Sequence, residues 1–236
     1  MRKPRAEISP PPARVVILPR LCAGAIACLG WTALGIELYF VVVGASAKNE
    51  TIAAALVRFF SFFTIQTHLL LALVLTIAAV RPDASGFLGR SGIKAAAVGY
   101  VAVVGAVYAV LLRHLYHWQG VMLLADSLLH DIVPVLYPLY WLAFVPKGGV
   151  RWADAFAWLV FPVAYFVYTL IRGALTGAYP YPFFNVLKLG YGQVTLNALG
   201  LLALFLAVGL AVAAIDRALS AQKGRGSREL GSAADF

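Results

Sequence analysis

The sequence has little charge: Asp, Glu, Lys and Arg make up 12% of its 236 residues, about half the share that is usual in soluble domains. Hydrophobic residues make up 62%, so the composition excludes an ordinary soluble enzyme and a disordered chain. Only two cysteines are present, too few for the disulfide framework of a small secreted protein. What remains is a polytopic membrane protein.

Common site motifs are also absent. The sequence contains no Walker loop, no CxxC pair and no HExxH motif. The formal net charge of +9 would suggest nucleic-acid binding only on a soluble surface. Here the basic residues lie in tails and loops, where membrane topology and lipid headgroups explain them. We therefore expect membrane lipid as a partner, and no nucleic acid, metal or cofactor.

Six apolar segments are long enough to cross a bilayer, which takes about 20 residues in a helix. They lie at 20–44, 52–80, 92–112, 119–144, 153–175 and 191–215. The first follows a basic segment, as in a cleavable signal, but it is longer than the apolar region of a typical signal. The sequence thus predicts an all-α bundle of six transmembrane helices at 20–216, with tails at 1–19 and 217–236.

The basic residues predict the orientation of the bundle. Of the 19 Lys and Arg residues, five lie at positions 2–20 in and beside the N-terminal tail, three at positions 81–94 in and beside the second loop, two between the fourth and fifth spans, and four in the C-terminal tail. By the positive-inside rule, this bias places both termini in the cytoplasm. We expect a multi-pass protein of the bacterial inner membrane.

Polar residues inside the predicted spans are unevenly distributed. They lie between the middle and the outer end of the spans, whereas the inner halves are almost wholly Ala, Leu, Val and Phe. Because polar side chains are costly in a bilayer, they are candidates for function. The distribution predicts a one-sided site that opens outward. Its candidates are Glu37, Thr64, Gln66, His68, Asp126, His130, Asp131, Tyr168, Arg172 and Asn197.

Thr64 and His130 are predicted to lie at the same depth. Their spans run in the same direction, and the two residues lie about 12 and 11 residues from the outer ends, or about 17 Å at 1.5 Å per residue. His68 lies one turn below Thr64, and Asp126 one turn above His130. Pro134 follows, and proline loosens the preceding turn of a helix. We expect a cavity at this level.

Two segments carry a family resemblance. Residues 59–66 (Phe-Phe-Ser-Phe-Phe-Thr-Ile-Gln), residues 130–134 (His-Asp-Ile-Val-Pro) and the six-span plan resemble the androgen-induced and androgen-dependent family of membrane threonine hydrolases. The stretch Tyr-Pro-Tyr-Pro-Phe at 179–183 is similar to that family's bacterial relatives. The resemblance covers roughly residues 20–216. It implies hydrolysis of fatty-acid esters of hydroxy fatty acids, with Thr64 as the nucleophile and His130 as its base.

The chemistry of this pair needs supporting groups. A threonine hydroxyl is a weak nucleophile that needs an adjacent base, and histidine suits that task. Asp126 or Asp131 is a candidate for orienting the imidazole. Asp126 shares a helix face with His130, whereas Asp131 points about 100° away. A donor to the oxyanion is also required. Candidate donors are Gln66, Tyr168, Arg172 and Asn197.

Other interpretations remain open. A threonine in a spanning helix often packs against a neighbour or bonds its own backbone. Glu37 and Arg172 are candidates for a structural ion pair. His68 and His130 also fit the axial ligands of one b-type haem in an electron carrier. A transporter or a lipid-binding protein is the remaining alternative, although no internal repeat of the kind common in carriers stands out.

Overall fold

The computed structural model describes residues 13–82 and 86–233, and over these residues the chain is helical with no β-strand. Six of its helical segments are long and apolar enough to cross a membrane, which confirms the predicted all-α, six-span architecture. These segments are Ile17–Val43, Phe63–Val80, Ser91–Leu115, Gly120–Phe144, Trp152–Thr176 and Val186–Gln222. The chain therefore has the architecture of a multi-pass membrane protein.

Several of these segments join more than one helix. The helices are α1 (Ala13–Val43), α2 (Ile52–Phe60), α3 (Phe63–Val80), α4 (Ser91–Val107), α5 (Gly120–Ser127), α6 (Val133–Phe144), α7 (Trp152–Ala157), α8 (Val160–Thr176) and α9 (Val186–Ala233). Two π-helical turns, η3 (Tyr108–Leu112) and η5 (Leu128–Ile132), follow α4 and α5. Because π-turns are rare overall but are often found at functional sites, these two turns indicate that a functional site lies near them.

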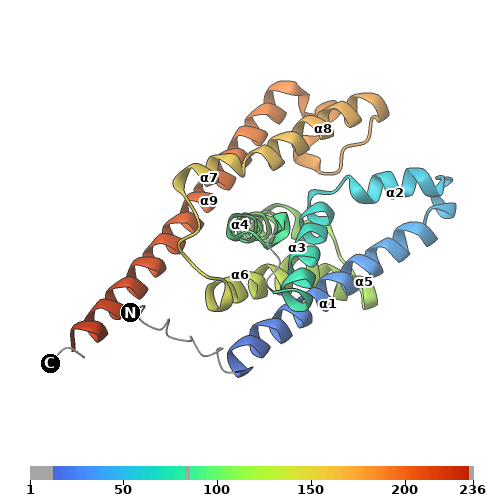
Figure 1. Ribbon diagram of the computed structural model, residues 1–236. Coiled ribbons are helices and arrows are strands. Elements are labelled where there is room, and N and C mark those ends of the chain that lie inside the picture. Colours follow the sequence, from blue (N-terminus) through green and yellow to red (C-terminus); the bar gives the residue numbers. More distant parts are fainter. Residues whose placement is uncertain (1–12, 83–85, 234–236) are drawn as a thin grey trace.

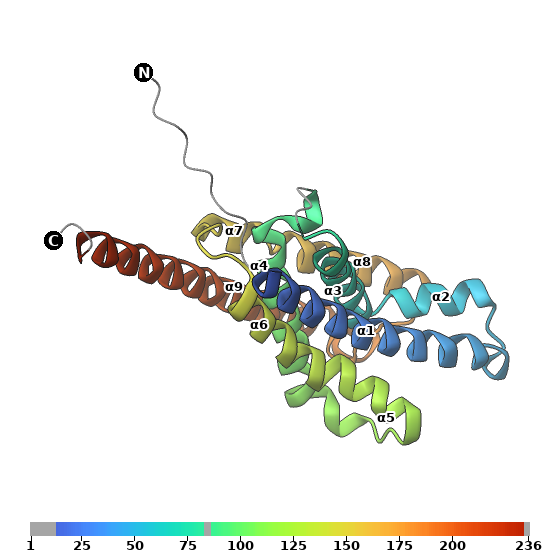
Figure 2. The same ribbon diagram turned by 60° about the horizontal axis from the view of Figure 1, so that its bottom comes forward.

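Helices α3 and α4 lie in the middle of the bundle (Figure 1). Helices α1, α5 and α6 pack on one side of this pair, and α7, α8 and α9 lie on the other. Helix α1 begins and α9 ends toward the same end of the bundle (Figure 2). We call the opposite end, where residues 44–51, 116–119 and 177–185 connect the helices, the distal end.

Large apolar side chains remain exposed on the outer helices. Leu175 is 81% exposed and Val110 is 74% exposed. In water such a surface would be unfavourable, but the hydrocarbon of a bilayer covers it without cost. The exposed surface thus agrees with the six spans.

The last span differs from the prediction. Helix α9 begins at Val186 and continues to Ala233, through most of the segment expected to be a tail. Gly190 interrupts its first turns with φ 73° and ψ 161°, a conformation that glycine adopts without strain. No proline follows Pro182 in the sequence to end the helix.

The prediction of one continuous helix over 52–80 is wrong. Helix α2 ends at Phe60 and α3 begins at Phe63, with Phe62 in an extended conformation between them (φ −85°, ψ 130°). Thr64 therefore lies in the first turn of α3 rather than in the middle of a longer helix. Neither glycine nor proline occurs between Ile52 and Val80, so no local signal indicates this break.

Polar side chains satisfy the carbonyl groups at the break. Tyr165 donates a hydrogen bond to the Ser61 carbonyl at 2.9 Å. Gln66 Nε2 donates to the Phe60 carbonyl at 2.8 Å, and Ser61 Oγ donates to the Val57 carbonyl. An unpaired carbonyl at membrane depth is costly, so these bonds are what permit a broken helix here.

Candidate active site

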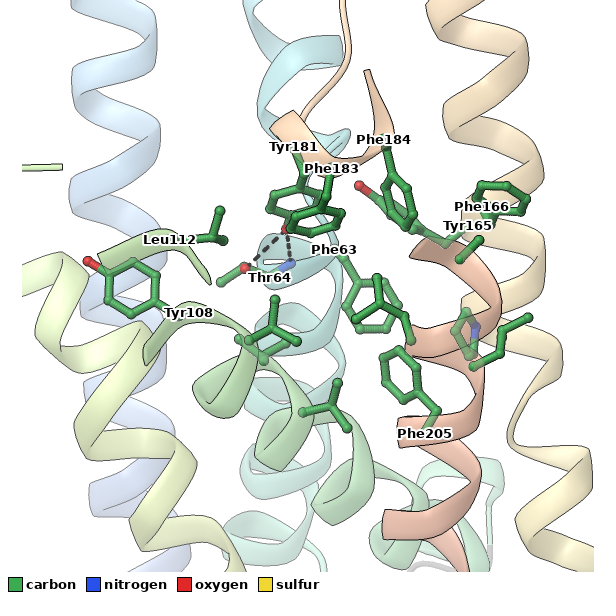
Figure 3. A pocket seen from close by; sticks show the side chains of 17 residues that line it. Phe63, Thr64, Tyr108, Leu112, Tyr165, Phe166, Tyr181, Phe183, Phe184 and Phe205 are labelled. Carbon is green, nitrogen blue, oxygen red and sulfur yellow. Dashed lines mark hydrogen bonds between the residues drawn. The ribbon is translucent and has the colours of Figure 1, made fainter. Parts of the chain in front are cut away.

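Thr64 is buried at the start of α3, where it is 8% exposed. The Tyr181 hydroxyl accepts a hydrogen bond from Thr64 N–H at 3.2 Å and lies 3.3 Å from Thr64 Oγ1 (Figure 3). Tyr181 directly precedes the short helix η6 (Pro182–Phe184) in the loop at the distal end. The first N–H groups of a helix have no partner within it and carry partial positive charge. The threonine hydroxyl therefore lies beside two hydrogen-bond donors.

His130 lies on the π-turn η5, where Asp126 holds its ring. Its Nδ1 lies 3.1 Å from Asp126 Oδ1 and 3.0 Å from the Asp126 carbonyl oxygen. Both atoms are acceptors, so Nδ1 carries a proton, and in the neutral imidazole the lone pair is then on Nε2. Asp131, the other candidate for this contact, instead forms an ion pair with Arg113.

Tyr108 contacts both members of this pair. Its hydroxyl donates to Asp126 Oδ2 at 2.5 Å, and its ring stacks on the His130 imidazole with a centroid separation of 3.8 Å and an interplanar angle of 12°. Sequence reasoning missed Tyr108 because an aromatic residue in an apolar span is most often a packing residue. The contact depends on the approach of η3, which follows α4, to the end of α5 and to η5, and no local sequence pattern predicts this approach.

Gly105 and Pro134 allow α4 to lie close to the π-turn η5. Pro134 has no N–H to donate to the His130 carbonyl, so one backbone hydrogen bond of an α-helix is missing at this point. A Cβ at Gly105 would lie 3.1 Å from Pro134 Cβ and 3.3 Å from the His130 carbonyl oxygen. A larger residue at position 105 would therefore push α4 away from His130.

Two cavities meet at Thr64. The first, which we call the aromatic cavity, measures about 60 Å³ and lies among α3, α4, α8, α9 and η6 (Figure 3). The second, which we call the histidine cavity, measures about 450 Å³ and extends toward the distal end. Thr64, Tyr108, Leu112 and Tyr181 line both.

Glu37, Asp126 and His130 line only the histidine cavity. Thr64 and His130 therefore face a common space, but they make no hydrogen bond to each other. Glu37 lies within electrostatic range of His130 and Asp126. Within residues 13–82 and 86–233, Glu37 forms no ion pair, so the alternative pairing with Arg172 is wrong.

The four residues considered as oxyanion donors line neither cavity. Each bonds elsewhere, three of them to a backbone carbonyl. Gln66 donates to Phe60, Arg172 to Ala178 and Asn197 to Phe183, while the Tyr168 hydroxyl bonds Ser61 Oγ. The donors beside Thr64 Oγ1 are its own N–H and the hydroxyl of Tyr181, whose role the sequence did not indicate.

His68 is a core residue, 1% exposed, and lines neither cavity. Its Nδ1 donates to the Thr64 carbonyl at 2.9 Å, and its Nε2 makes no hydrogen bond within the described part of the chain. Neither cavity therefore has both His68 and His130 on its wall, as one haem between two axial ligands would require.

Charged residues surround the distal mouth of the histidine cavity. Lys48 and Arg58 line it, and Arg58 pairs with Glu50 at 2.8 Å. The Arg58 guanidinium lowers the pKa of the Glu50 carboxyl by hydrogen bonding to it, so this ion pair is intact at neutral pH.

No group of three or more His, Cys, Asp or Glu side chains within the described residues is arranged to hold a metal ion. The chain matches no family model, no curated protein and no solved structure.

Proposed function

We propose that this membrane protein hydrolyses carboxylic esters of lipid-like molecules, with Thr64 as nucleophile and His130 as general base. The observation that carries the proposal is that both residues face the histidine cavity while Asp126 holds Nδ1 of His130. That contact leaves Nε2 of the neutral imidazole able to accept a proton, as in the imidazole–carboxylate part of a hydroxyl–imidazole–carboxylate triad.

In the first half of the reaction, Thr64 Oγ1 bonds to the ester carbonyl carbon while its proton passes to His130 Nε2. The carbonyl electron pair moves onto the carbonyl oxygen. When this intermediate collapses, the bond to the alcohol oxygen breaks and that oxygen takes the proton from Nε2. An acyl-threonine remains. Catalytic hydrogen bonds commonly tighten only when the substrate binds, so the open Thr64–His130 geometry suits a state without substrate.

In the second half, a water molecule gives a proton to His130 Nε2 while its oxygen bonds to the acyl carbon. The acyl–Oγ1 bond of Thr64 then breaks, and the proton returns from Nε2 to Oγ1. The carboxylic acid is released and both residues regain their starting states.

The negative charge on the carbonyl oxygen needs donors in both halves. We assign this role to Thr64 N–H and the Tyr181 hydroxyl, which lie together beside Thr64 Oγ1; when substrate binds, its carbonyl oxygen replaces the Tyr181 oxygen as the acceptor of Thr64 N–H. Burial raises the pKa of the Tyr181 phenol, so it keeps its proton at neutral pH. The partial positive charge at the start of α3 acts in the same direction.

The segments around Thr64 and His130 resemble those of membrane threonine hydrolases, which favours a fatty-acid ester of a hydroxy fatty acid as the substrate. The positive-inside bias favours cytoplasmic termini. In that orientation the distal end, and with it the mouth of the histidine cavity, faces away from the cytoplasm. We propose the bacterial inner membrane as the location.

A covalent probe tests the proposal. Full-length protein in detergent is treated with a fluorophosphonate, and the modified residue is located by mass spectrometry. We expect the label on Thr64, and we expect it to disappear in His130→Ala because the hydroxyl loses its base. The exposed His114→Ala serves as the control and should label normally. A folded protein that takes no label would contradict hydrolysis and favour lipid binding or transport.

Tyr181→Phe removes a single oxyanion donor and should lower kcat by about 10²- to 10³-fold, as loss of such a donor does elsewhere. Steady-state kinetics on a chromogenic ester measures this, with KM changing much less than kcat. Tyr179→Phe is the matched control, since its hydroxyl makes no hydrogen bond within the described residues and lines neither cavity. Equal kcat in the two variants would remove Tyr181 from the mechanism.

A further inference from the structure

Building on the proposed hydrolysis, we infer that the two cavities divide the substrate between them. The acyl chain lies in the aromatic cavity, and the departing alcohol lies in the histidine cavity. This inference fixes the direction in which the ester binds and names the chemical class of each half.

The position of the general acid sets the direction. His130 must come within hydrogen-bond reach, about 2.6–3.2 Å, of the alcohol oxygen that it protonates. His130 lines the histidine cavity and not the aromatic cavity. The alcohol must therefore leave on that side of Thr64. The acyl group, attached to Thr64 Oγ1, is left to extend into the space on the other side.

The aromatic cavity begins directly at Thr64. In Figure 3, Tyr108 and Leu112 lie on one side of Thr64, and Phe63, Tyr165 and Phe205 lie on the other. An acyl chain that extends toward the second side contacts aromatic rings from α3, α8 and α9. An acyl chain bonded to Oγ1 thus has a continuous apolar path away from His130.

The walls of the two cavities differ in chemistry. None of the residues lining the aromatic cavity is charged. Its only polar side chains are those of Thr64 and three tyrosines, so it favours a hydrocarbon chain over a charged group. The histidine cavity has five Asp, Glu, Lys, Arg or His side chains on its wall: Glu37, Lys48, Arg58, Asp126 and His130. It accepts polar groups that the aromatic cavity excludes.

Their sizes differ as well. At about 60 Å³ against about 450 Å³, the aromatic cavity is much the smaller of the two. The smaller cavity favours a slender, unbranched acyl chain, whereas the larger one takes a bulkier alcohol. The substrate class is therefore a straight-chain acyl ester of a larger alcohol that carries polar groups.

Two matched truncations test the assignment. Phe205→Ala enlarges the aromatic cavity, and Phe40→Ala enlarges the histidine cavity. Each full-length variant is assayed on two series of esters. The first varies the acyl chain from acetyl to palmitoyl on 4-methylumbelliferone, and the second varies the alcohol of butyrate esters from methyl to branched and polar alcohols. Leu201→Phe, which fills the aromatic cavity, is a second variant that tests the same cavity if the Phe205→Ala protein fails to fold.

We expect Phe205→Ala to raise the kcat/KM ratio of long to short acyl chains about tenfold, the scale on which apolar pockets discriminate. Its preference among alcohols should not change. Leu201→Phe should shift the acyl preference toward shorter chains, and Phe40→Ala should change only the preference among alcohols. Reversed effects, or no change in either series with turnover intact, would overturn the assignment while leaving the hydrolase. A wild-type protein without turnover or label would overturn both.

Discussion

Thr64→Ala should abolish ester hydrolysis, lowering kcat by at least about 10⁴-fold, because no acyl-enzyme can form without the hydroxyl. The substitution should leave the fold intact. The hydrogen bond from the backbone N–H of residue 64 to Tyr181 does not involve the side chain, and it remains possible in the variant. Hydrolysis of a fluorogenic ester, measured beside thermal unfolding of the same sample, separates the two effects.

Thr67→Ala is the matched control for this experiment. Thr67 lies in the same helix, is 1% exposed and lines neither cavity. Its hydroxyl makes no hydrogen bond within the described part of the chain, so its removal costs little. Thr64→Ser, which keeps a hydroxyl, should retain measurable turnover. Undiminished hydrolysis by Thr64→Ala would rule out the nucleophile and, with it, the acyl-threonine.

The six spans could be predicted because hydropathy over about 20 residues is a strong local signal. The break between α2 and α3 could not be predicted from the sequence. Nothing between Ile52 and Val80 disfavours a continuous helix, and the Ser61 carbonyl is satisfied by Tyr165, which lies 104 residues along the chain. A tertiary hydrogen bond thus decides the local conformation, and through it the position of Thr64 at a helix start.

The contacts of the candidate site also fall into two groups, those that the sequence predicts and those that it does not. The contact between Asp126 and His130 follows from a spacing of four residues on one helix, so the sequence distinguishes Asp126 from Asp131. The partners Tyr108 and Tyr181 come from other segments, and the sequence gives no reason to choose them among 11 tyrosines. Their roles depend on how α4 and the loop before α9 pack, which only the folded chain determines.

Asp126→Asn should lower kcat by at least about 10²-fold with little change in KM. Loss of the equivalent charge costs about 10⁴-fold in the serine-protease triad, where the histidine takes the wrong tautomer. Here the Asp126 carbonyl oxygen still accepts from Nδ1 at 3.0 Å, so the tautomer is retained. What is lost is the negative charge that stabilises the imidazolium formed when Thr64 is deprotonated. The effect should therefore be smaller than in the protease.

Two variants separate this charge effect from a general loss of structure. Asp131→Asn changes the carboxylate beside His130 on the π-turn η5, which pairs with Arg113 and not with the imidazole, so kcat should stay within about twofold of wild type. Tyr108→Phe keeps the ring stacked on His130 but removes the hydrogen bond to Asp126 Oδ2. Because the carboxylate then keeps its charge and its contact with Nδ1, the loss should be milder than in Asp126→Asn. If Asp131→Asn were the more damaging change, the imidazole would be oriented by the other carboxylate during turnover.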